Sequence, residues 1–551
     1  MTHDVIVLGS GAAGLAAVLS AHDAGADVGI YEKAEYVGGT AAWSGGMVWM
    51  PNNPHMKANG ISDSPEEAFE YIKSLTHGLV DDSLLRAFLE HGPEAVSWLE
   101  EHTPVEFELI AGFPDYHPTH PGAKESGGRT MACPLFPFAE LGEWASKVWV
   151  GHQLPSNIAI SETTFGEGAG TGPTSEDLER RKIRDERGTG QALVGAMLRG
   201  CLDRGITPRT GVRARSLIVE DGRVAGVRFD TDGVEFEVRA RRAVILATGG
   251  FEHNAERVRS FLRGPLDRPV SVPTNTGDGL DMAMRVGASL GNMREAWWAP
   301  TIDIDHPDLG RVPWLVNGER SRPHSIMVNR AGVRFANESA NYNAFGAAFH
   351  YLDVSSYNYS NHPAWLIFDH HYLTKFGLAS HSVASELPDW ITRAESFETL
   401  AKAIDVPETA LVATVRRWNE NAVAGHDPDF GRGESTLDRW WGDRDAGDSA
   451  AANVAPLDAP PYYAVQVRSG ALGTKGGPCT DAHGRVQSVD GTAIPGLYAA
   501  GNAMASVMGM TYGGAGGTLG PALTYGWLAG RDAAVAPRGD GDPSRPETTQ
   551  L

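Results

Sequence analysis

The sequence predicts an α/β fold in which one domain is inserted into another. An apolar run at residues 5–8 ends in glycines and continues into an Ala- and Leu-rich segment, in the order strand, turn, helix. Glycine-rich segments of the same α/β character return after residue 460. The chain between about 294 and 460 is instead rich in aromatic residues. Because the two ends match each other and the middle differs, we expect the middle to be an insertion.

Composition excludes several classes of protein. The 551 residues carry a formal net charge of −22, which argues against a nucleic-acid binder and against docking on anionic lipid by charge alone. With 42% hydrophobic and 21% charged residues, the chain is typical of globular proteins. No run of about 18 apolar residues occurs, so we expect no integral membrane segment. No basic region precedes an apolar stretch at the N-terminus, which predicts no signal peptide.

Three cysteines, Cys133, Cys201 and Cys479, show no CxxC-type spacing. This spacing favours neither a disulfide framework nor a zinc site, and it fits a cytoplasmic protein. His253, His362, His370 and His371 lack metal-ligand spacing with carboxylates, so we predict no metal.

The elements follow in order along the chain. We expect a helix at 12–24, a strand at 28–31, mostly helix at 66–101, a polar surface excursion or mobile lid at 151–190, strands at 216–219, 224–229, 234–238 and 243–247, a helix at 518–534 and a frayed tail at 536–551. Asp221-Gly222 between two apolar runs predicts a hairpin. Residues 1–293 and 463–551 are predicted to form one domain, and 294–462 an inserted α+β domain.

A dinucleotide fingerprint lies at the first turn. Gly9-Ser10-Gly11-Ala12-Ala13-Gly14 fits G-x-G-x-x-G, follows a strand and opens a helix. Gly9 permits the tight turn, Gly11 lets the backbone approach a pyrophosphate, and Gly14 allows close packing of helix on strand. Glu32 ends the second strand, where it can accept from ribose hydroxyls. The alternative is an ordinary glycine turn in an αβ unit.

Further glycine-rich turns indicate FAD rather than NAD. Gly38-Gly39-Thr40 follows the acidic residue, Thr248-Gly249-Gly250 follows a buried strand, and Ala500-Gly501-Asn502 lies near the end of the chain. A second strand–GxGxxG–helix unit does not occur, so a built-in NAD(P)H domain is not expected. This arrangement resembles the FAD flavoproteins of the fumarate reductase and succinate dehydrogenase superfamily, whose Rossmann-type FAD domain is interrupted by a capping domain. No His follows Gly38-Gly39, where covalent members attach the flavin, so we predict non-covalent FAD.

Nine motifs narrow the resemblance. They lie at 44–53, 115–118, 127–129, 249–254, 275–279, 296–301, 337–342, 472–477 and 506–522. Together they resemble the 3-ketosteroid Δ1-dehydrogenases, from about residue 4 to 534. The fingerprint and this resemblance together imply the following cofactor contacts: Gly9, Gly11, Ala12, Ala13, Gly14, Glu32, Lys33, Gly39, Thr40, Ala41, Ser44, Gly45, Gly46, Val212, Thr248, Gly249, Asn275, Asp278, Gly501, Asn502, Gly517, Thr518 and Leu519.

The resemblance also implies a reaction, the removal of hydrogen from C1 and C2 of a 3-ketosteroid. Tyr512 and the backbone N–H of Gly516 match the family's donors to the ketone oxygen. Tyr342 matches the base that takes the C2 proton, and the C1 hydride goes to flavin N5. Tyr116 matches the tyrosine that hydrogen-bonds the base. The implied partners are an apolar ketone, in this family a steroid, and an external electron acceptor, either a quinone or oxygen.

Phe113 and Trp298 are predicted to line an apolar substrate pocket, with core packing as the plain alternative. Two departures from the family bear on the substrate, because Gly513 and Asn341 stand where the family usually has proline. We expect Gly513 to loosen the loop that carries Tyr512.

Three alternatives stay open. The first is a dehydrogenase or ene-reductase of the fumarate reductase-like family that acts on another ketone or enoate. Arg320 and Arg322 lie near where those reductases carry an arginine, although a surface salt bridge is the plain interpretation of both. The second is a Δ4 dehydrogenase of related steroids, and the third is a flavin-binding protein without catalysis.

Overall fold

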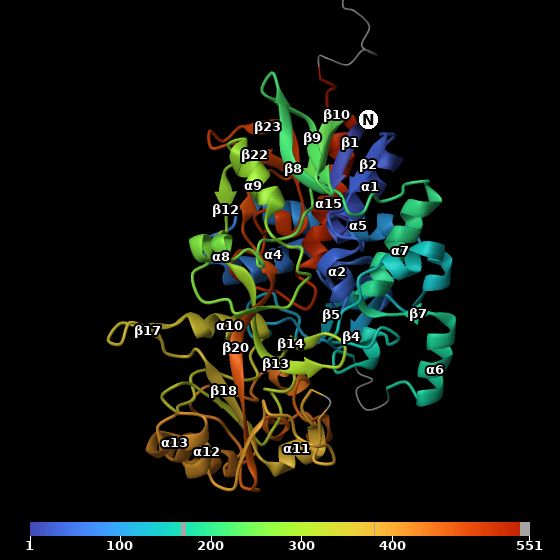
Figure 1. Cartoon of the computed structure of the whole chain (residues 1–551). Helices are drawn as coiled ribbons and strands as arrows, with labels where there is room; N and C mark the ends of the chain where they lie inside the picture. Colours follow the sequence, from blue (N-terminus) through green and yellow to red (C-terminus); the bar gives the residue numbers. More distant parts are fainter. Residues whose placement is uncertain (167–171, 380, 540–551) are drawn as a thin grey trace, which may run out of the picture.

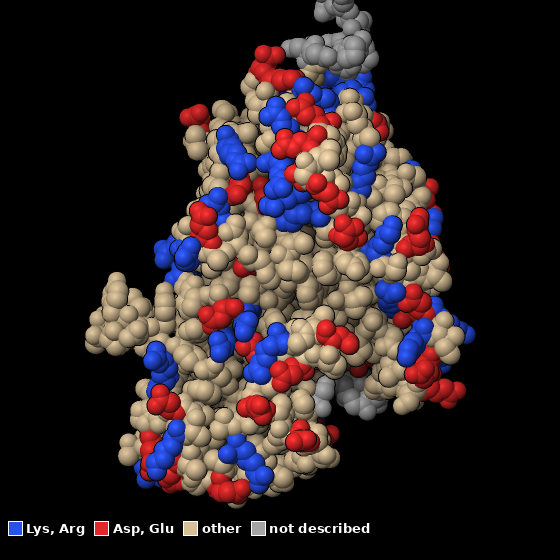
Figure 2. Space-filling model, in the orientation of Figure 1, with Lys and Arg blue, Asp and Glu red and all other residues tan. Residues whose placement is uncertain are grey.

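The computed structural model describes residues 1–166, 172–379 and 381–539. It has the predicted mixed α/β fold. The N-terminal and C-terminal segments form the upper part of the molecule in Figure 1, and the segment between them forms most of the lower part. Charged side chains of both signs are intermixed over the face shown in Figure 2.

The first sheet holds the dinucleotide turn. Its central strands run in the order β2–β1–β10–β23–β22, and β1, β2, β10 and β23 pair in parallel. The bounds are Thr2–Leu8 (β1), Val28–Tyr31 (β2), Arg213–Glu220 (β8), Arg223–Thr231 (β9), Val234–Leu246 (β10), Arg485–Gln487 (β22) and Ala493–Ala499 (β23). The predicted hairpin at Asp221-Gly222 joins β8 and β9.

One expectation about this sheet was wrong. We expected two strands at 234–238 and 243–247, but the structure has the single long strand β10. The first half of β10 pairs antiparallel with β9, and the second half pairs parallel with β1 and β23. The mostly polar residues 239–242, between the two apolar runs, therefore belong to the strand. The partner strand changes from β9 to β1 there, so the backbone stays paired.

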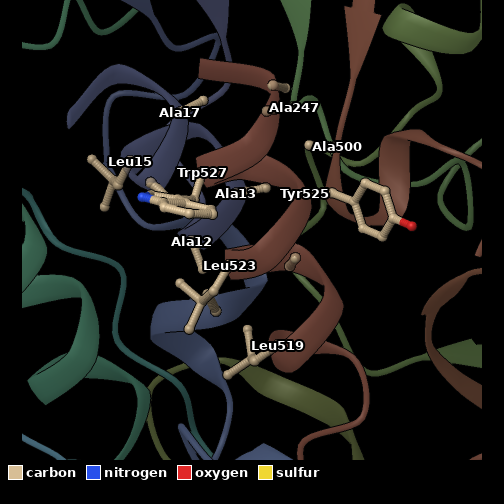
Figure 3. Close-up of a cluster of buried hydrophobic side chains, with 14 of the residues drawn as sticks. Ala12, Ala13, Leu15, Ala17, Ala247, Ala500, Leu519, Leu523, Tyr525 and Trp527 are labelled. Carbon is tan, nitrogen blue, oxygen red and sulfur yellow. The ribbon is translucent and has the colours of Figure 1, made fainter. Parts of the chain in front are cut away.

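Two helices from opposite ends of the chain pack together beside this sheet. They are α1 (Ala12–Asp23) and α15 (Leu519–Val535), and Figure 3 shows their apolar side chains interleaved with Ala247 and Ala500. A Cβ on Gly526 would lie 2.3 Å from the Ala13 carbonyl oxygen, and one on Gly530 would lie 2.3 Å from that of Ala17. The small residues therefore let the helices approach closely, which brings the last motif of the sequence beside the first.

The second sheet runs in the order β14–β13–β20–β18–β15. Its bounds are Arg268–Pro269 (β11), Ala296–His306 (β13), Gly310–Leu315 (β14), Ser325–Val328 (β15), Ala364–Phe368 (β18), Thr392–Ala394 (β19) and Tyr462–Thr474 (β20). The helices that follow or cover it are α10 (Tyr342–Ala347), α11 (His370–Phe376), α12 (Phe397–Ala403), α13 (Glu408–Val423) and α14 (Thr436–Trp440). The division at 293/294 and 462/463 stays a prediction. Strand β20 begins at the second boundary and pairs within the second sheet as far as Thr474.

The remaining elements surround the first sheet and the junction between the two sheets. They are α2 (Gly39–Trp43), β3 (Val48–Trp49), α3 (Pro54–Ala58), α4 (Pro65–Thr76), α5 (Asp82–His102), β4 (Glu108–Ala111), β5 (Gly127–Ala132), β6 (Phe136–Pro137), α6 (Ser175–Arg184), β7 (Glu186–Arg187), α7 (Thr189–Asp203), α8 (Ala255–Phe261), α9 (Asp278–Arg285), β12 (Leu290–Gly291), β16 (Leu352–Asp353), β17 (Asn358–Tyr359) and β21 (Gly477–Pro478).

The predicted excursion at 151–190 contains α6, which Arg181 ties to Glu162 through two hydrogen bonds of 2.7 Å. Its residues 167–171 lie outside the described residues, as does the tail prediction for 540–551. Among the helices described, none is both long and apolar enough to cross a membrane.

Candidate active site

The first turn has the geometry that the fingerprint predicts. Gly9 has φ +101°, and a Cβ there would lie 2.3 Å from the carbonyl oxygen of Ala247. A Cβ on Gly14 would lie 1.9 Å from the Gly9 carbonyl oxygen. A Cβ on Gly11 would meet nothing nearer than 3.9 Å, because this residue borders an open cavity. The turn therefore needs glycine at two positions for packing and leaves the third free to approach a ligand.

A single cavity extends along this turn from the first sheet to the second. Its wall includes most of the predicted cofactor contacts: Gly9, Gly11, Ala12, Ala13, Glu32, Lys33, Gly39, Thr40, Ala41, Ser44, Gly45, Gly46, Val212, Thr248, Gly249, Asn275, Asp278, Gly501, Asn502, Thr518 and Leu519. Gly14 and Gly517 do not line it, since Gly14 packs beneath the turn and Gly517 packs against the ring of Tyr512.

Polar groups on this wall fit a dinucleotide. The Glu32 carboxylate accepts from Ser10 N (2.9 Å) and Ala34 N (2.9 Å), which fixes it at the end of β2 with lone pairs to spare. Lys33 Nζ donates to Asp278 at 2.9 Å. The Thr248 hydroxyl is buried on the wall without a hydrogen-bond partner among the described residues. A buried hydroxyl of this kind needs a partner, and a bound cofactor would provide one.

The three predicted tyrosines come together beside this cavity. The ring centroids of Tyr116 and Tyr342 are 5.5 Å apart, those of Tyr116 and Tyr512 are 5.3 Å apart, and those of Tyr342 and Tyr512 are 5.5 Å apart. All three pairs meet edge to face, and all three rings are buried. Tyr342 and Tyr512 line the cavity with Gly516, whereas Tyr116 lies behind them.

Two groups that can donate hydrogen bonds lie together on this wall, the hydroxyl of Tyr512 and the backbone amide of Gly516. The Tyr512 hydroxyl lies 3.0 Å from Thr518 Oγ1. Burial raises the pKa of Tyr512, while hydrogen bonds from Thr518, Tyr342 and the Gly516 backbone lower it in part. Gly516 has φ +98° and precedes α15, whose N-terminus carries partial positive charge. A neighbouring hydroxyl and amide are the kind of donors that stabilise a carbonyl oxygen.

The surroundings of Tyr342 do not by themselves favour its anion. Burial raises the pKa of Tyr342 well above 10, and the neighbouring Tyr116 and Tyr512 raise it further. Burial also raises the pKa of Tyr116, whose hydroxyl has no hydrogen-bond partner of ordinary geometry among the described residues. Deprotonation of this cluster therefore requires an acceptor for the proton or a ligand that changes its surroundings.

The two departures from the family pattern have structural roles. Asn341 caps α10 by accepting from Ala344 N at 2.9 Å, and its Nδ2 donates to the Tyr116 carbonyl oxygen at 3.2 Å. The Gly513 carbonyl oxygen accepts from the Tyr71 hydroxyl at 2.7 Å and from Tyr116 N at 2.9 Å. We expected Gly513 to loosen its loop, but these two bonds hold the loop without a proline.

Phe113 and Trp298 do not lie on the cavity wall, contrary to the prediction. Phe113 is buried among Tyr116, Trp440 and Trp441, with ring separations of 5.4–6.2 Å. Trp298 is fully buried and packs on His350, with ring centroids 4.1 Å apart. Both rings are instead part of the packed core, which was the alternative interpretation of the sequence.

Sequence reasoning missed other residues of the cavity wall. They include Trp43, Gln153, Leu154, Phe165, Trp314, Leu315 and Glu319. These residues come from the end of α2, the 151–190 excursion, β14 and the loop after β14. None of the nine motifs covers these segments; Met47 of the 44–53 motif and Arg322, named for its rival role, also line the cavity. Arg320, the neighbour of Arg322, is fully buried and donates to the Val316 carbonyl oxygen at 3.1 Å, so it is no surface salt bridge.

Comparison with known proteins identifies the class. A family model described as an FAD binding domain matches residues 4–519. The 4-oxocyclohexanecarboxylate 2-dehydrogenase of Sinomonas cyclohexanicum is 40% identical over 97% of this chain and 93% of that protein. The 3-oxosteroid 1-dehydrogenase of Mycobacterium tuberculosis is 37% identical over 96% of this chain and 97% of that protein.

A solved structure is similar to this chain in fold as well as in sequence. The crystal structure of 3-ketosteroid Δ1-dehydrogenase from Sterolibacterium denitrificans in complex with 1,4-androstadiene-3,17-dione has a TM-score of 0.89 and 35% identity, covering 97% of this chain and 99% of that one. The chain belongs to the FAD-binding flavoproteins and, within them, to the 3-oxosteroid 1-dehydrogenase group of FAD-dependent oxidoreductases that act on CH–CH bonds. The predicted family and FAD are therefore confirmed. Its non-covalent attachment and cytoplasmic location stay predictions.

Proposed function

We propose that the protein removes hydrogen from the α carbon and the adjoining β carbon of a ring ketone, as in the C1–C2 dehydrogenation of a 3-ketosteroid. The observation that carries this proposal is that Tyr342, Tyr512 and Gly516 line the same cavity as the predicted FAD contacts. FAD bound there supplies a hydride acceptor.

The chain's own residues account for the proton chemistry. Tyr512 and the Gly516 amide hold the ketone oxygen and stabilise the negative charge that develops on it, which makes the neighbouring C–H acidic. Tyr342 takes the proton from that carbon, and the edge contact with Tyr116 holds its ring in place. The three buried rings exclude water from the reacting carbons.

One observation favours a second substrate, a cyclohexanone that carries a carboxylate. Arg322 lines the cavity and has no acidic partner in the described parts of the chain; its Nη1 donates to the Phe376 carbonyl oxygen at 3.4 Å, and its guanidinium stacks on the Phe376 ring at 4.9 Å. Glu319 lines the same cavity, but its carboxylate oxygens accept from Trp314 Nε1 (3.1 Å) and Asn317 N (2.9 Å). A guanidinium without a carboxylate partner on a cavity wall suits an anionic substituent, which a plain steroid nucleus lacks. The 40% identical relative is a dehydrogenase of such a keto acid.

Reduction of a small enoate such as fumarate has less support. Binding a dicarboxylate needs several cationic groups, yet Arg320 does not line the cavity, and its Nε and Nη1 donate to the carbonyl oxygens of Val316 and Glu338 inside the core. The tyrosine cluster offers hydroxyls, which suit a ketone.

A side-by-side assay tests these alternatives. Purified holoenzyme is mixed with a dye acceptor and a 3-ketosteroid, 4-oxocyclohexanecarboxylate or its methyl ester, and separately with fumarate and a reduced dye. We expect turnover with at least one ring ketone and none with fumarate. Activity on fumarate alone would contradict the proposal. A preference for the keto acid over its ester that disappears in Arg322→Met would assign the carboxylate to Arg322.

A further inference from the structure

We propose that Lys475 is a positioning residue that holds the segments of Tyr342 and Tyr512 at a fixed distance from each other. The inference rests on the proposed function, in which Tyr512 binds the ketone oxygen and Tyr342 takes the proton from the neighbouring carbon. Lys475 directly follows β20, the strand that leads from the second sheet back toward the first.

The lysine is wholly enclosed. Its side chain is 0% exposed, and its backbone is fixed by Lys475 N donating to the Glu295 carbonyl oxygen at 2.9 Å and by Ser506 N donating to the Lys475 carbonyl oxygen at 2.9 Å. Burial lowers the pKa of Lys475 to about 7, against the opposing effect of Glu295. A buried amine is costly for a fold, so the contacts that it makes require an explanation.

Those contacts lead to both tyrosines. Lys475 Nζ donates to the carbonyl oxygen of Thr511, the residue before Tyr512, at 2.7 Å. It also lies 3.4 Å from Oδ1 of Asn343, the residue after Tyr342. One nitrogen therefore joins the loop that carries the predicted donor to the first turn of the helix that carries the predicted base.

The third contact of the amine leads to the same place. Lys475 Nζ lies 4.2 Å from the centroid of the Trp297 ring, a cation–π geometry. The Trp297 ring in turn packs on Tyr512 with centroids 4.7 Å apart. Its Nε1 donates at 3.0 Å to Asn502, which lines the cavity. The three donors of the ammonium thus meet two acceptors and one ring face, and each belongs to the frame around the tyrosines.

Positioning matters here because the base and the donor come from different parts of the fold. Tyr342 begins α10, which contacts β13 of the second sheet, whereas Tyr512 lies in the loop before α15. Their separation therefore depends on tertiary contacts, which include the edge-to-face contact of the two rings and the bonds of Lys475. Misplacement of a reacting group by about 1 Å can lower a rate about 100-fold.

The test replaces Lys475 by Met, which is unbranched and one atom shorter and removes the donors. The matched control is Lys402→Met, whose side chain is 72% exposed. Anaerobic stopped-flow with the active ketone gives the rate constant of flavin reduction and the dissociation constant of the ketone. We expect Lys475→Met to lower the rate about 100-fold and change ketone binding less than about threefold. Lys402→Met is expected to leave both values unchanged.

A double-mutant cycle separates positioning from general destabilisation. Lys475→Met is combined with Tyr512→Phe, which removes the group that the lysine is inferred to aim. In the Tyr512→Phe background, we expect Lys475→Met to lower the rate constant of flavin reduction only about threefold or less, because the effects of coupled residues are not additive. An equal factor in both backgrounds, or a wild-type rate in Lys475→Met, would overturn the inference.

Two further measurements cover the remaining outcomes. If Lys475→Met does not bind FAD, Asn343→Leu removes the contact of Lys475 with the Tyr342 segment, together with the 3.4 Å hydrogen bonds from Asn343 Nδ2 to the carbonyl oxygens of Ala296 and Trp298. Asn343→Asp is the control, because it keeps an oxygen facing Lys475 and changes the group that faces β13. We expect Asn343→Leu to reduce the flavin about tenfold more slowly than Asn343→Asp, with a loss that is non-additive with Tyr342→Phe. A crystal structure of either variant should show Tyr342 and Tyr512 displaced from their 5.5 Å centroid separation. An unchanged separation would refute the positioning role. The crystal structures test the positioning role of Lys475 even if no ketone reduces the wild-type flavin. That failure would contradict the proposed function and leave the test of Lys475 intact.

Discussion

Replacing Tyr512 by Phe tests the assigned donor most directly. The hydroxyl lies 3.0 Å from Thr518 Oγ1 and also interacts with Tyr342 and the Gly516 backbone, while the ring makes contacts with Tyr116, Tyr342 and Trp297 that Phe retains. Loss of a hydrogen bond costs about 1 kcal/mol of folding free energy, so the total loss is small beside the roughly 5–15 kcal/mol of an ordinary domain. The variant should therefore fold and bind FAD.

The catalytic loss should be much larger than the folding loss. Two donors face the ketone oxygen in the proposed complex, and Tyr512→Phe leaves only the Gly516 amide. Removing one such donor costs about 10²–10³ in rate, or about 3–4 kcal/mol. Ketone binding should weaken as well, since the same hydroxyl binds the ground state.

The assay is anaerobic reduction of the enzyme-bound flavin by the active ketone, followed by stopped-flow absorbance. Tyr342→Phe serves as the comparison, because it removes the base and keeps both donors. We expect Tyr342→Phe to lose at least as much rate with less effect on ketone binding, and neither variant to change reoxidation by the acceptor. Reduction at the wild-type rate in Tyr342→Phe would remove Tyr342 from the mechanism, and the same result in Tyr512→Phe would remove Tyr512.

Three other predictions follow from the same site. Burial and the two neighbouring tyrosines raise the pKa of Tyr342, so only a small fraction of Tyr342 is deprotonated at neutral pH. The rate of flavin reduction at saturating ketone should therefore increase as the pH rises toward 10. A rate that does not change with pH would contradict a tyrosinate base. Acid denaturation should release FAD into the supernatant, whereas flavin retained by the precipitated chain would disprove non-covalent attachment. Gly11→Ala should give a folded protein with weakened FAD binding, because its Cβ enters the cavity and lies no nearer than 3.9 Å to the protein. Gly172→Ala is the control for the loss of a glycine, since a Cβ there would lie 3.7 Å from the nearest atom, its φ is not left-handed, and it lies outside the cavity wall. FAD content after gel filtration checks this last prediction, and equal occupancy in both variants would count against the assigned cradle.

The sequence by itself determined the parts of the molecule that depend on local geometry. The turn at 9–14 could be predicted because a strand, three spaced glycines and a helix leave the backbone few alternatives. Helix 519–535 and the hairpin at Asp221-Gly222 follow from apolar periodicity and turn chemistry in the same way. The motifs around Tyr116, Tyr342 and Tyr512 named the cluster through resemblance, and the structure brings the three rings within contact distance.

Only the tertiary structure decided what surrounds those residues. Phe113 and Trp298 are aromatic residues in or near the motifs, yet packing places them in the core. Phe165 and Arg322 lie outside the nine motifs, yet they line the cavity. The roles of Asn341 and Gly513 also became visible only through their hydrogen bonds to distant residues. Local pattern records which face of an element is apolar, but it does not record which other element covers that face. A cavity wall is assembled from segments hundreds of residues apart, so its membership is a property of the packed chain.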